Sequence, residues 1–196
     1  MALSILDSFQ KSHISTDISA AASVEFFWKF GIFYAENSEI GQLVSELDNE
    51  ELSEDHLAKY KPILSKDERI SSILESQSYL ESSPFLIQRL ASEPGRFFAS
   101  TTDDEPDNRL LLYVCSHGAM LELCQFSHKQ KWKGVPTSDG MMQIPYSQIK
   151  KRRKIVETLV EVQFNLEQGG VVLVHPRLAI QMKNGFTHIY GLQGNP

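Results

Sequence analysis

RLLLYVCSHGAMLELCQFSH, residues 109–128, is the stretch around which the chain is organised. Apolar residues lie on both sides of one glycine, and the stretch contains both cysteines and two of the six histidines. The pattern predicts a β-hairpin that turns near Gly118–Ala119 and forms the centre of the core. It is also the first place to look for catalytic or metal-binding residues.

Cys115, His117, Cys124 and His128 are residue types that bind zinc, but the predicted strands keep them apart. Zinc needs four donor atoms within about 2.0–2.3 Å of one point. A strand advances about 3.3 Å per residue, which separates His117 from His128 by roughly 25 Å along such a hairpin. The sequence therefore predicts no metal site, and it indicates no cofactor.

Two residue pairs are weak candidates for catalysis. Cys115 and His117 share one face of a strand, where a thiol could use the imidazole as its base. His175 and His188 are expected on neighbouring strands, where they could act as an acid–base couple. The chain contains no GxGxxG, GxxxxGK[ST], HExxH or GxSxG motif. A small enzyme that uses one of these pairs is therefore the alternative interpretation and not the leading one.

The first half of the chain has the periodicity of short helices. Apolar residues recur at three- and four-residue steps between polar start signals and Gly or Pro stops. The predicted helices cover residues 17–36, 38–47, 53–61, 65–80 and 83–93. The aromatic part of the first one, residues 24–34, faces either the core of this chain or a partner, so an oligomerising adaptor, including a homo-oligomer, is a further alternative.

The second half has the pattern of strands. Residues 96–100 fit an edge strand, and Asn184–Gly185 has the turn signal of a hairpin within 171–192. Residues 146–168 fit a helix or a strand, and their length favours one long helix. The sequence therefore predicts an α+β protein in which a helical N-terminal half packs on a largely antiparallel C-terminal sheet crossed by that helix.

Length and composition indicate one domain, residues 1–196, with a sub-boundary near residue 95 (1–95 helical, 96–196 strand-rich) as the other option. No run of residues resembles a membrane span or a secretory signal. Two cysteines without an export signal indicate a reducing compartment. We therefore expect a soluble intracellular protein, cytoplasmic, nuclear or both.

Charge is unevenly distributed along the chain, whose net charge is −6. Residues 128–154 contain 8 of the 19 Lys and Arg residues but only 1 of the 25 acids. Lys150–Lys154, KKRRK, resembles a monopartite nuclear localisation signal. At the start of a long helix these cations would oppose the helix dipole, which suggests that they are kept for a function.

The second basic cluster alternates Lys129, Lys131 and Lys133 on one strand face, with Trp132 on the other. Such lysines can follow a phosphate backbone, and an adjacent aromatic ring can stack on a base. The leading hypothesis is a non-enzymatic binding protein whose basic patch engages nucleic acid, an import receptor or an acidic protein surface. The expected binding residues are Lys129, Lys131, Trp132, Lys133, Lys150, Lys151, Arg152, Arg153 and Lys154.

Overall fold

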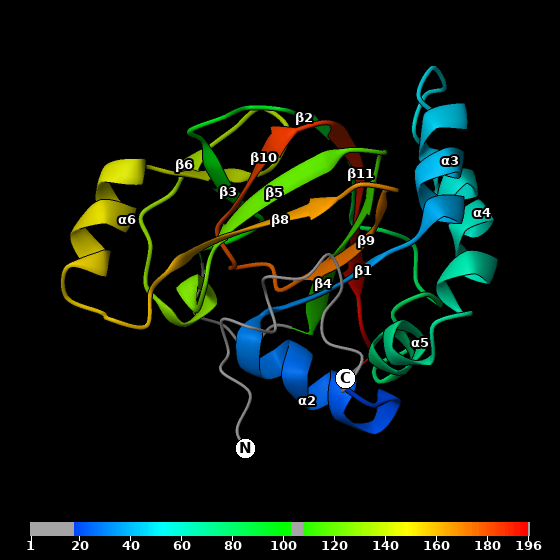
Figure 1. The fold of residues 1–196 in the computed structure, drawn as a ribbon, viewed down its shortest axis with the longest axis horizontal. Coiled ribbons are helices and arrows are strands. Elements are labelled where there is room, and N and C mark those ends of the chain that lie inside the picture. The colour runs from blue at the N-terminus through cyan, green and yellow to red at the C-terminus, as the bar shows by residue number, and fades with distance from the viewer. Residues whose placement is uncertain (1–17, 103–107, 196) are drawn as a thin grey trace.

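The computed structural model describes residues 18–102 and 108–195. Figure 1 shows a β-barrel with α3, α4 and α5 at one side and α6 at the opposite side. The helices are α2 (Ala20–Phe30), α3 (Ser38–Glu46), α4 (Glu54–Leu64), α5 (Glu68–Glu75), the 3₁₀ helix η1 (Ser127–Lys129) and α6 (Tyr146–Arg153). None of these described helices has the length and hydropathy needed to span a membrane.

The described strands form two antiparallel sheets. The first has the order β1-β9-β4-β11-β2, and the second has the order β6-β7-β3-β10-β5-β8. The strands of the first sheet are β1 (Ile32–Glu36), β2 (Leu86–Ala91), β4 (Arg109–Cys115), β9 (Gly170–Val174) and β11 (Phe186–Gln193). The strands of the second sheet are β3 (Phe97–Ala99), β5 (Ala119–Cys124), β6 (Val135–Pro136), β7 (Met142–Ile144), β8 (Glu161–Leu166) and β10 (Ile180–Asn184).

Eight of these strands pair as a ribbon that is folded back on itself. β5 pairs with β8, β4 with β9, β3 with β10 and β2 with β11, and successive pairs alternate between the two sheets. Two sheets connected in this way form a jelly roll. The α+β class and the order of helices before strands are therefore confirmed.

The core lies between the two sheets and beneath the helices. Tyr34 of β1 stacks on Phe164 of β8 with ring centroids 4.1 Å apart, so both side chains face the barrel interior. Strand register then identifies the residues beside Tyr34 on the same inner face as Val172, Tyr113, Ile189 and Gln88. On the outer face of this sheet, the Tyr60 hydroxyl of α4 is hydrogen-bonded to His188 Nδ1 at 3.1 Å.

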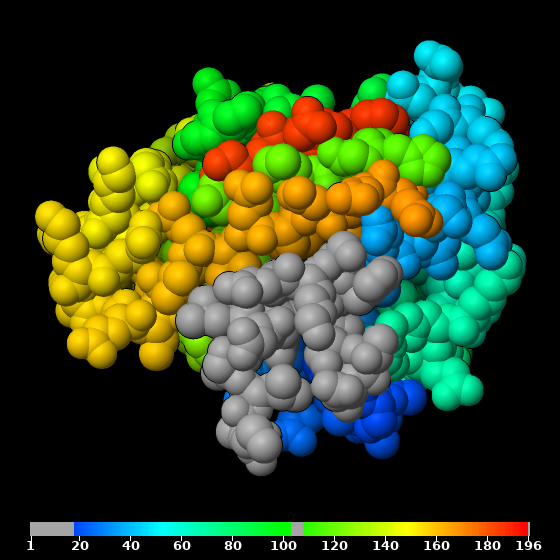
Figure 2. Space-filling model, viewed as in Figure 1, coloured from blue at the N-terminus to red at the C-terminus, as the bar shows by residue number. Residues whose placement is uncertain are grey.

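The outer face of the second sheet is not covered by these helices. Figure 2 shows β8, β5 and β10 side by side at the surface of the molecule. Burial along β8 alternates residue by residue, as expected for a strand with one face in the core and one in solvent.

The predicted helix over residues 17–36 is wrong in its second half. Ser19 caps α2 by accepting the Ala22 backbone N–H, and the helix ends at Gly31, where φ is 75°. The chain continues directly as β1. Phe27 and Phe30 are buried, as is the whole of β1 up to Ala35, so most of the aromatic segment 24–34 packs into the core of this chain.

Residues 146–168 form two elements where one long helix was expected. α6 ends at Arg153, and Val162, Phe164 and Leu166 of β8 alternate into the core while the strand pairs with β5. Residues 161–166 follow the two-residue period of a strand because they pair with β5, and the length of the segment could not predict this pairing. The helix predicted over residues 83–93 is likewise a strand, β2, which pairs with β11.

Neither predicted hairpin forms. β4 and β5 belong to different sheets, and so do β10 and β11. The turns at Gly118 and Gly185 have φ values of 67° and 76°, so the glycine signals are correct, but each turn is a corner that takes the chain from one sheet to the other.

The two ends of the barrel differ in their connections. Short turns around Gly118, Gly169 and Gly185 close one end, which we call the turn end. At the other end, which we call the loop end, the chain leaves β3 at Ser100, and the connections 125–160 and 175–179 lie there. Binding and catalytic residues occur mainly on long loops held by a rigid scaffold, and the mouth of a barrel is a frequent ligand site.

Candidate active site at the loop end

Cys115 and His117 do not form a catalytic pair. Cys115 is fully buried in β4, and its thiol lies 3.6 Å from Thr187 Oγ1. Burial raises the pKa of this thiol to about 12, so the thiolate is absent at neutral pH. His117 lies in the exposed turn that follows the strand. Cys115 is therefore a structural residue, and this candidate pair was wrong.

The pair His175 and His188 is also wrong, because the two rings lie in different environments. His188 is on β11, beneath the helices, where burial lowers its pKa to about 4 and Tyr60 is its hydrogen-bond partner. His175 follows β9 at the loop end, with its ring centroid 5.9 Å from that of Trp28. The zinc set is not brought together either, since the described residues contain no group of three His, Cys, Asp or Glu placed to hold a metal ion.

The two basic clusters do lie side by side. Arg152 Nη2 donates a hydrogen bond to the Lys131 carbonyl at 3.2 Å, and Gln148 Nε2 donates to the Lys133 carbonyl at 2.7 Å. A surface hollow of about 530 Å³ lies between α6 and the loop of residues 131–133. It is lined by Lys131, Trp132, Lys133, Gln148, Lys151, Arg152 and Ile155.

The structure removes the physical reasons for assigning these residues a function. The basic run occupies the last turn of α6, where the helix dipole stabilises cations. Residues 127–129 form η1, so the lysines do not alternate on a strand. Trp132 is 5% exposed, and its indole N–H donates to the Ser127 carbonyl at 2.7 Å, so its ring is part of the core.

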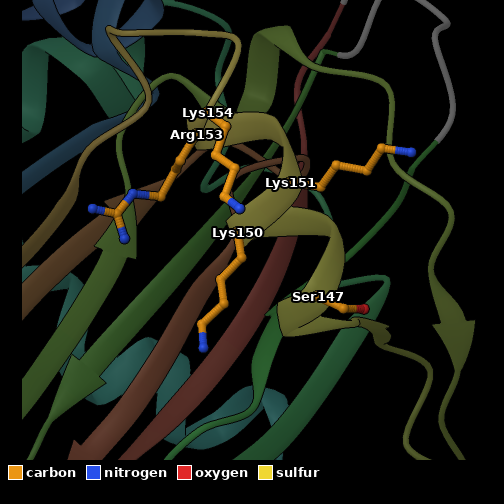
Figure 3. A pocket seen from close by; sticks show the side chains of 5 residues that line it. All are labelled: Ser147, Lys150, Lys151, Arg153 and Lys154. Atoms are coloured by element: carbon orange, nitrogen blue, oxygen red, sulfur yellow. The ribbon is translucent and has the colours of Figure 1, made fainter.

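A second hollow, of about 630 Å³, is lined, among the described residues, by side chains of α6 and its C-cap Lys154. Figure 3 shows that Lys151 and Arg153 extend to opposite sides of the helix, so its cationic side chains do not converge on one point. Arg153 is moreover paired with Glu161 at 2.6 Å. This hollow is a gap between surface side chains and has no arrangement that would orient a ligand.

The loop end brings together a pair of imidazoles that the sequence analysis did not connect. The rings of His128 in η1 and His175 after β9 have centroids 5.2 Å apart. His175 is half-buried, its Nδ1 accepts the Arg177 backbone N–H at 3.2 Å, and its own backbone N–H donates to the Gly31 carbonyl at 2.8 Å. These backbone bonds attach His175 both to its own loop and to the end of α2.

His128 is the more buried ring, at 5% exposed. Neither of its ring nitrogens makes a hydrogen bond of normal geometry. Burial, followed by the charges of His175, Lys129 and Arg177, lowers its pKa to about 3, and the Lys29 carbonyl opposes this shift only weakly. His128 is therefore neutral at physiological pH. Its surroundings are electropositive, because Lys129 and Arg177 are the charged residues beside it.

The comparisons with known proteins concern the fold alone. No model of a known protein family matches this chain, and no curated protein sequence matches it. Among solved structures it is similar to AviO1 from Streptomyces viridochromogenes Tue57, with a TM-score of 0.52, 15% identity, 93% of this chain covered and 99% of that chain. It is also similar to the epimerase SnoN in complex with Fe³⁺, alpha ketoglutarate and nogalamycin RO, with a TM-score of 0.50, 11% identity, 90% of this chain covered and 86% of that chain.

These similarities contradict the leading hypothesis from the sequence. SnoN is an epimerase whose structure contains Fe³⁺, alpha ketoglutarate and nogalamycin RO, so a fold similar to this one occurs in an enzyme. The expectation of a non-enzymatic binding protein for nucleic acid, an import receptor or an acidic partner is therefore wrong, and a nuclear role has no support. The expectation that the protein is not an enzyme is corrected for the same reason.

The described residues of this chain, 18–102 and 108–195, do not fit the iron centre that the fold implies. Non-heme iron oxygenases hold Fe(II) with two imidazoles and one carboxylate on one face of the metal. In the described part of the chain, no three such donors come together. The Nδ1 lone pair of His175 already accepts the Arg177 N–H, and Lys129 beside His128 repels a metal cation.

Proposed function

We propose that this protein is an enzyme that acts on a small organic molecule at the loop end of the barrel. The observation that carries the proposal is the imidazole pair His128 and His175, 5.2 Å apart, one in the connection 125–160 and the other in the connection 175–179. The similarity of the fold to that of SnoN supports an enzyme in general terms. The ligand class is consistent with the use of barrel mouths as small-molecule sites.

His175 is the residue that we expect to contact the substrate. Because its Nδ1 accepts a backbone N–H, the neutral ring carries its proton on Nε2. Nε2 is then the ring nitrogen that carries the transferable proton. The backbone hydrogen bond fixes this tautomer and holds the ring in place before the substrate binds.

His128 is a positioning residue behind His175. Its ring lies against Gly31, so close that a Cβ added to that glycine would lie 2.6 Å from Nδ1. Because the His128 ring is neutral, it can pack against His175 without adding a positive charge. Lys129 and Arg177 make the surroundings positive, which favours substrates with a carbonyl, carboxylate or other electron-rich oxygen.

The location of the enzyme is part of the proposal. Cys115 and Cys124 are buried free thiols, which suits a reducing compartment such as the cytoplasm.

The experiment is a conversion assay with mass spectrometry. The full chain is incubated with a small-molecule extract of its source cells, and masses that decrease or increase with time are recorded. We expect the His175→Gln variant to lose conversion by at least about tenfold, as is usual when a general acid–base group is removed. His117→Gln, an exposed histidine at the turn end, is the matched control and should convert like the unmodified protein.

Thermal unfolding of each variant shows whether it is folded. Conversion that is lost in folded His175→Gln and kept in His117→Gln supports the proposal. The absence of any converted molecule, or conversion that is unaffected in His175→Gln, would overturn it.

A further inference from the structure

The side chains that face the barrel interior differ in chemical character from the imidazole pair. Inward-facing positions follow from the Tyr34–Phe164 stack and the strand register, as above. At the loop end most of these positions are occupied by hydrocarbon side chains from both sheets, although Gln143, opposite Phe98, and Arg109, opposite Gln193, also fall on inward positions. We call this set the loop-end ring: Leu111 and Val174 from the first sheet, and Phe98, Leu123, Val162 and Ile180 from the second.

The side chains of the loop-end ring are buried. Each of its six side chains is at most 8% exposed, and all belong to one hydrophobic cluster. Ile180 is the direct register partner of both Phe98 and Leu123, so the second sheet presents three adjacent apolar residues there. A charged or metal-bound group placed among these side chains would lose its hydration without gaining a partner.

In the middle of the barrel, the inward polar residues Tyr113 and Gln88 are neutral. Tyr113 has its pKa raised by burial, with Cys115 and Asp139 adding to the shift, so its phenol stays protonated. Gln88 lies on the same inner face as Tyr113, because both residues are register partners of Ile189. Neither a phenol nor an amide belongs to the donor set of a facial triad.

Imidazoles and carboxylates are nearly absent from these inner faces. Among the described strands, the inward positions include no histidine, and His188 points outward to Tyr60. Glu36 is the carboxylate at an inward position, but it lies at the turn end and accepts the Gln168 backbone N–H at 2.6 Å. Among the residues that the structure describes, two imidazoles and a carboxylate therefore do not meet between the sheets.

We propose that hydrophobic side chains take the place of a facial-triad iron centre in this barrel, and that the chain works without Fe(II) and 2-oxoglutarate bound between its sheets. The proposal deepens the function proposed above and rests on it only where it concerns catalysis. The site of the chemistry is then the His128–His175 pair, which lies in the connections outside the strands that carry the loop-end ring.

The test measures metal binding first and conversion second. The full chain is stripped with EDTA, transferred to metal-free buffer and titrated without oxygen with Fe(II), and separately with Ni(II), each with and without 2-oxoglutarate. Bound metal is counted by elemental analysis after gel filtration, and titration calorimetry gives the affinity. We expect close to zero ions per chain and no increase on addition of 2-oxoglutarate.

One saturable ion per chain that binds more tightly with 2-oxoglutarate would overturn the proposal. Weak metal binding that is the same with and without 2-oxoglutarate agrees with it, since surface histidines bind metals in this way. The double variant His128→Gln/His175→Gln shows whether such binding involves the imidazole pair.

Conversion in excess EDTA separates this inference from the proposed function. Conversion that continues unchanged supports both. Conversion that stops with EDTA and returns with Fe(II) overturns the inference and leaves the enzyme in place. No metal binding together with no conversion supports the inference and overturns the proposed function.

Discussion

Gly31 and His128 are in direct contact at the loop end, with no space for a side chain between them. A Cβ on Gly31 would lie 2.6 Å from His128 Nδ1 and 2.9 Å from Cε1. The same glycine ends α2 with φ 75° and accepts the His175 backbone N–H through its carbonyl. Gly31 thus terminates α2, leads directly into β1 and contacts both histidines of the candidate site.

We expect Gly31→Ala to destabilise the protein by two effects. The positive φ costs about 1 kcal/mol for a residue with a side chain, and overpacking against His128 adds about 1–3 kcal/mol. The free energy of unfolding in urea measures the sum. Gly95→Ala is the matched control, because Gly95 has φ 86° but nothing within 4 Å of an added Cβ, so it should show the backbone cost alone.

The double variant Gly31→Ala/His128→Ala separates the two effects further. If the contact is as close as described, removing the imidazole should restore part of the stability lost in Gly31→Ala. Equal destabilisation by Gly31→Ala and Gly95→Ala would contradict the contact.

Stability should fall as the pH is lowered from about 6.5, because two histidines are buried in the neutral form. His128 and His188 have folded pKa values near 3 and 4, below the usual value of about 6.5 in an unfolded chain. The unfolded chain therefore binds more protons than the folded one between these values, so protons favour unfolding. Each histidine should remove roughly 2–3 kcal/mol between pH 6.5 and 4.5.

Urea unfolding at pH 7.5, 6 and 4.5 measures this loss. His128→Leu should reduce the loss of stability by about half, because the leucine has no proton to gain while His188 still contributes. His117→Gln, at an exposed position, should leave the profile as it is. A profile that is flat in the unmodified protein would show that neither ring is buried and neutral.

Both thiols should be unreactive in the folded protein. Cys115 and Cys124 are each 0% exposed, and burial raises both pKa values to about 12. Iodoacetamide at neutral pH should therefore label neither until the chain is unfolded in guanidinium chloride, when both react. Mass spectrometry counts the labels, and rapid labelling of Cys115 in the folded chain would restore it as a candidate nucleophile.

The sequence predicted the fold where the signals were local. Helices were expected over the residues of α3, α4 and α5, and strands over most of the second half, because caps and apolar periods depend on nearby residues. Pairing between strands is not local. The turn residues at Gly118 and Gly185 have the same chemistry in a hairpin as in a corner between sheets, so their signal could not show which sheet the next strand joins.

The candidate site was harder to predict. His128 and His175 are far apart in sequence, and no motif connects them. Each lies in an irregular segment, where side-chain direction does not follow from a period of 2 or 3.6. Cys115 and His117 stood out because they are close in sequence, yet the strand places one in the core and the other in solvent.

The most direct measurement of the central claim is a histidine NMR titration. The ring C–H signals are assigned by single replacement, and the molecule identified by conversion, or its product, is added to the full chain. Shifts confined to His128 and His175 are the predicted result. Shifts at His117 or His188, with the signals of His128 and His175 unchanged, would contradict an active site at the loop end.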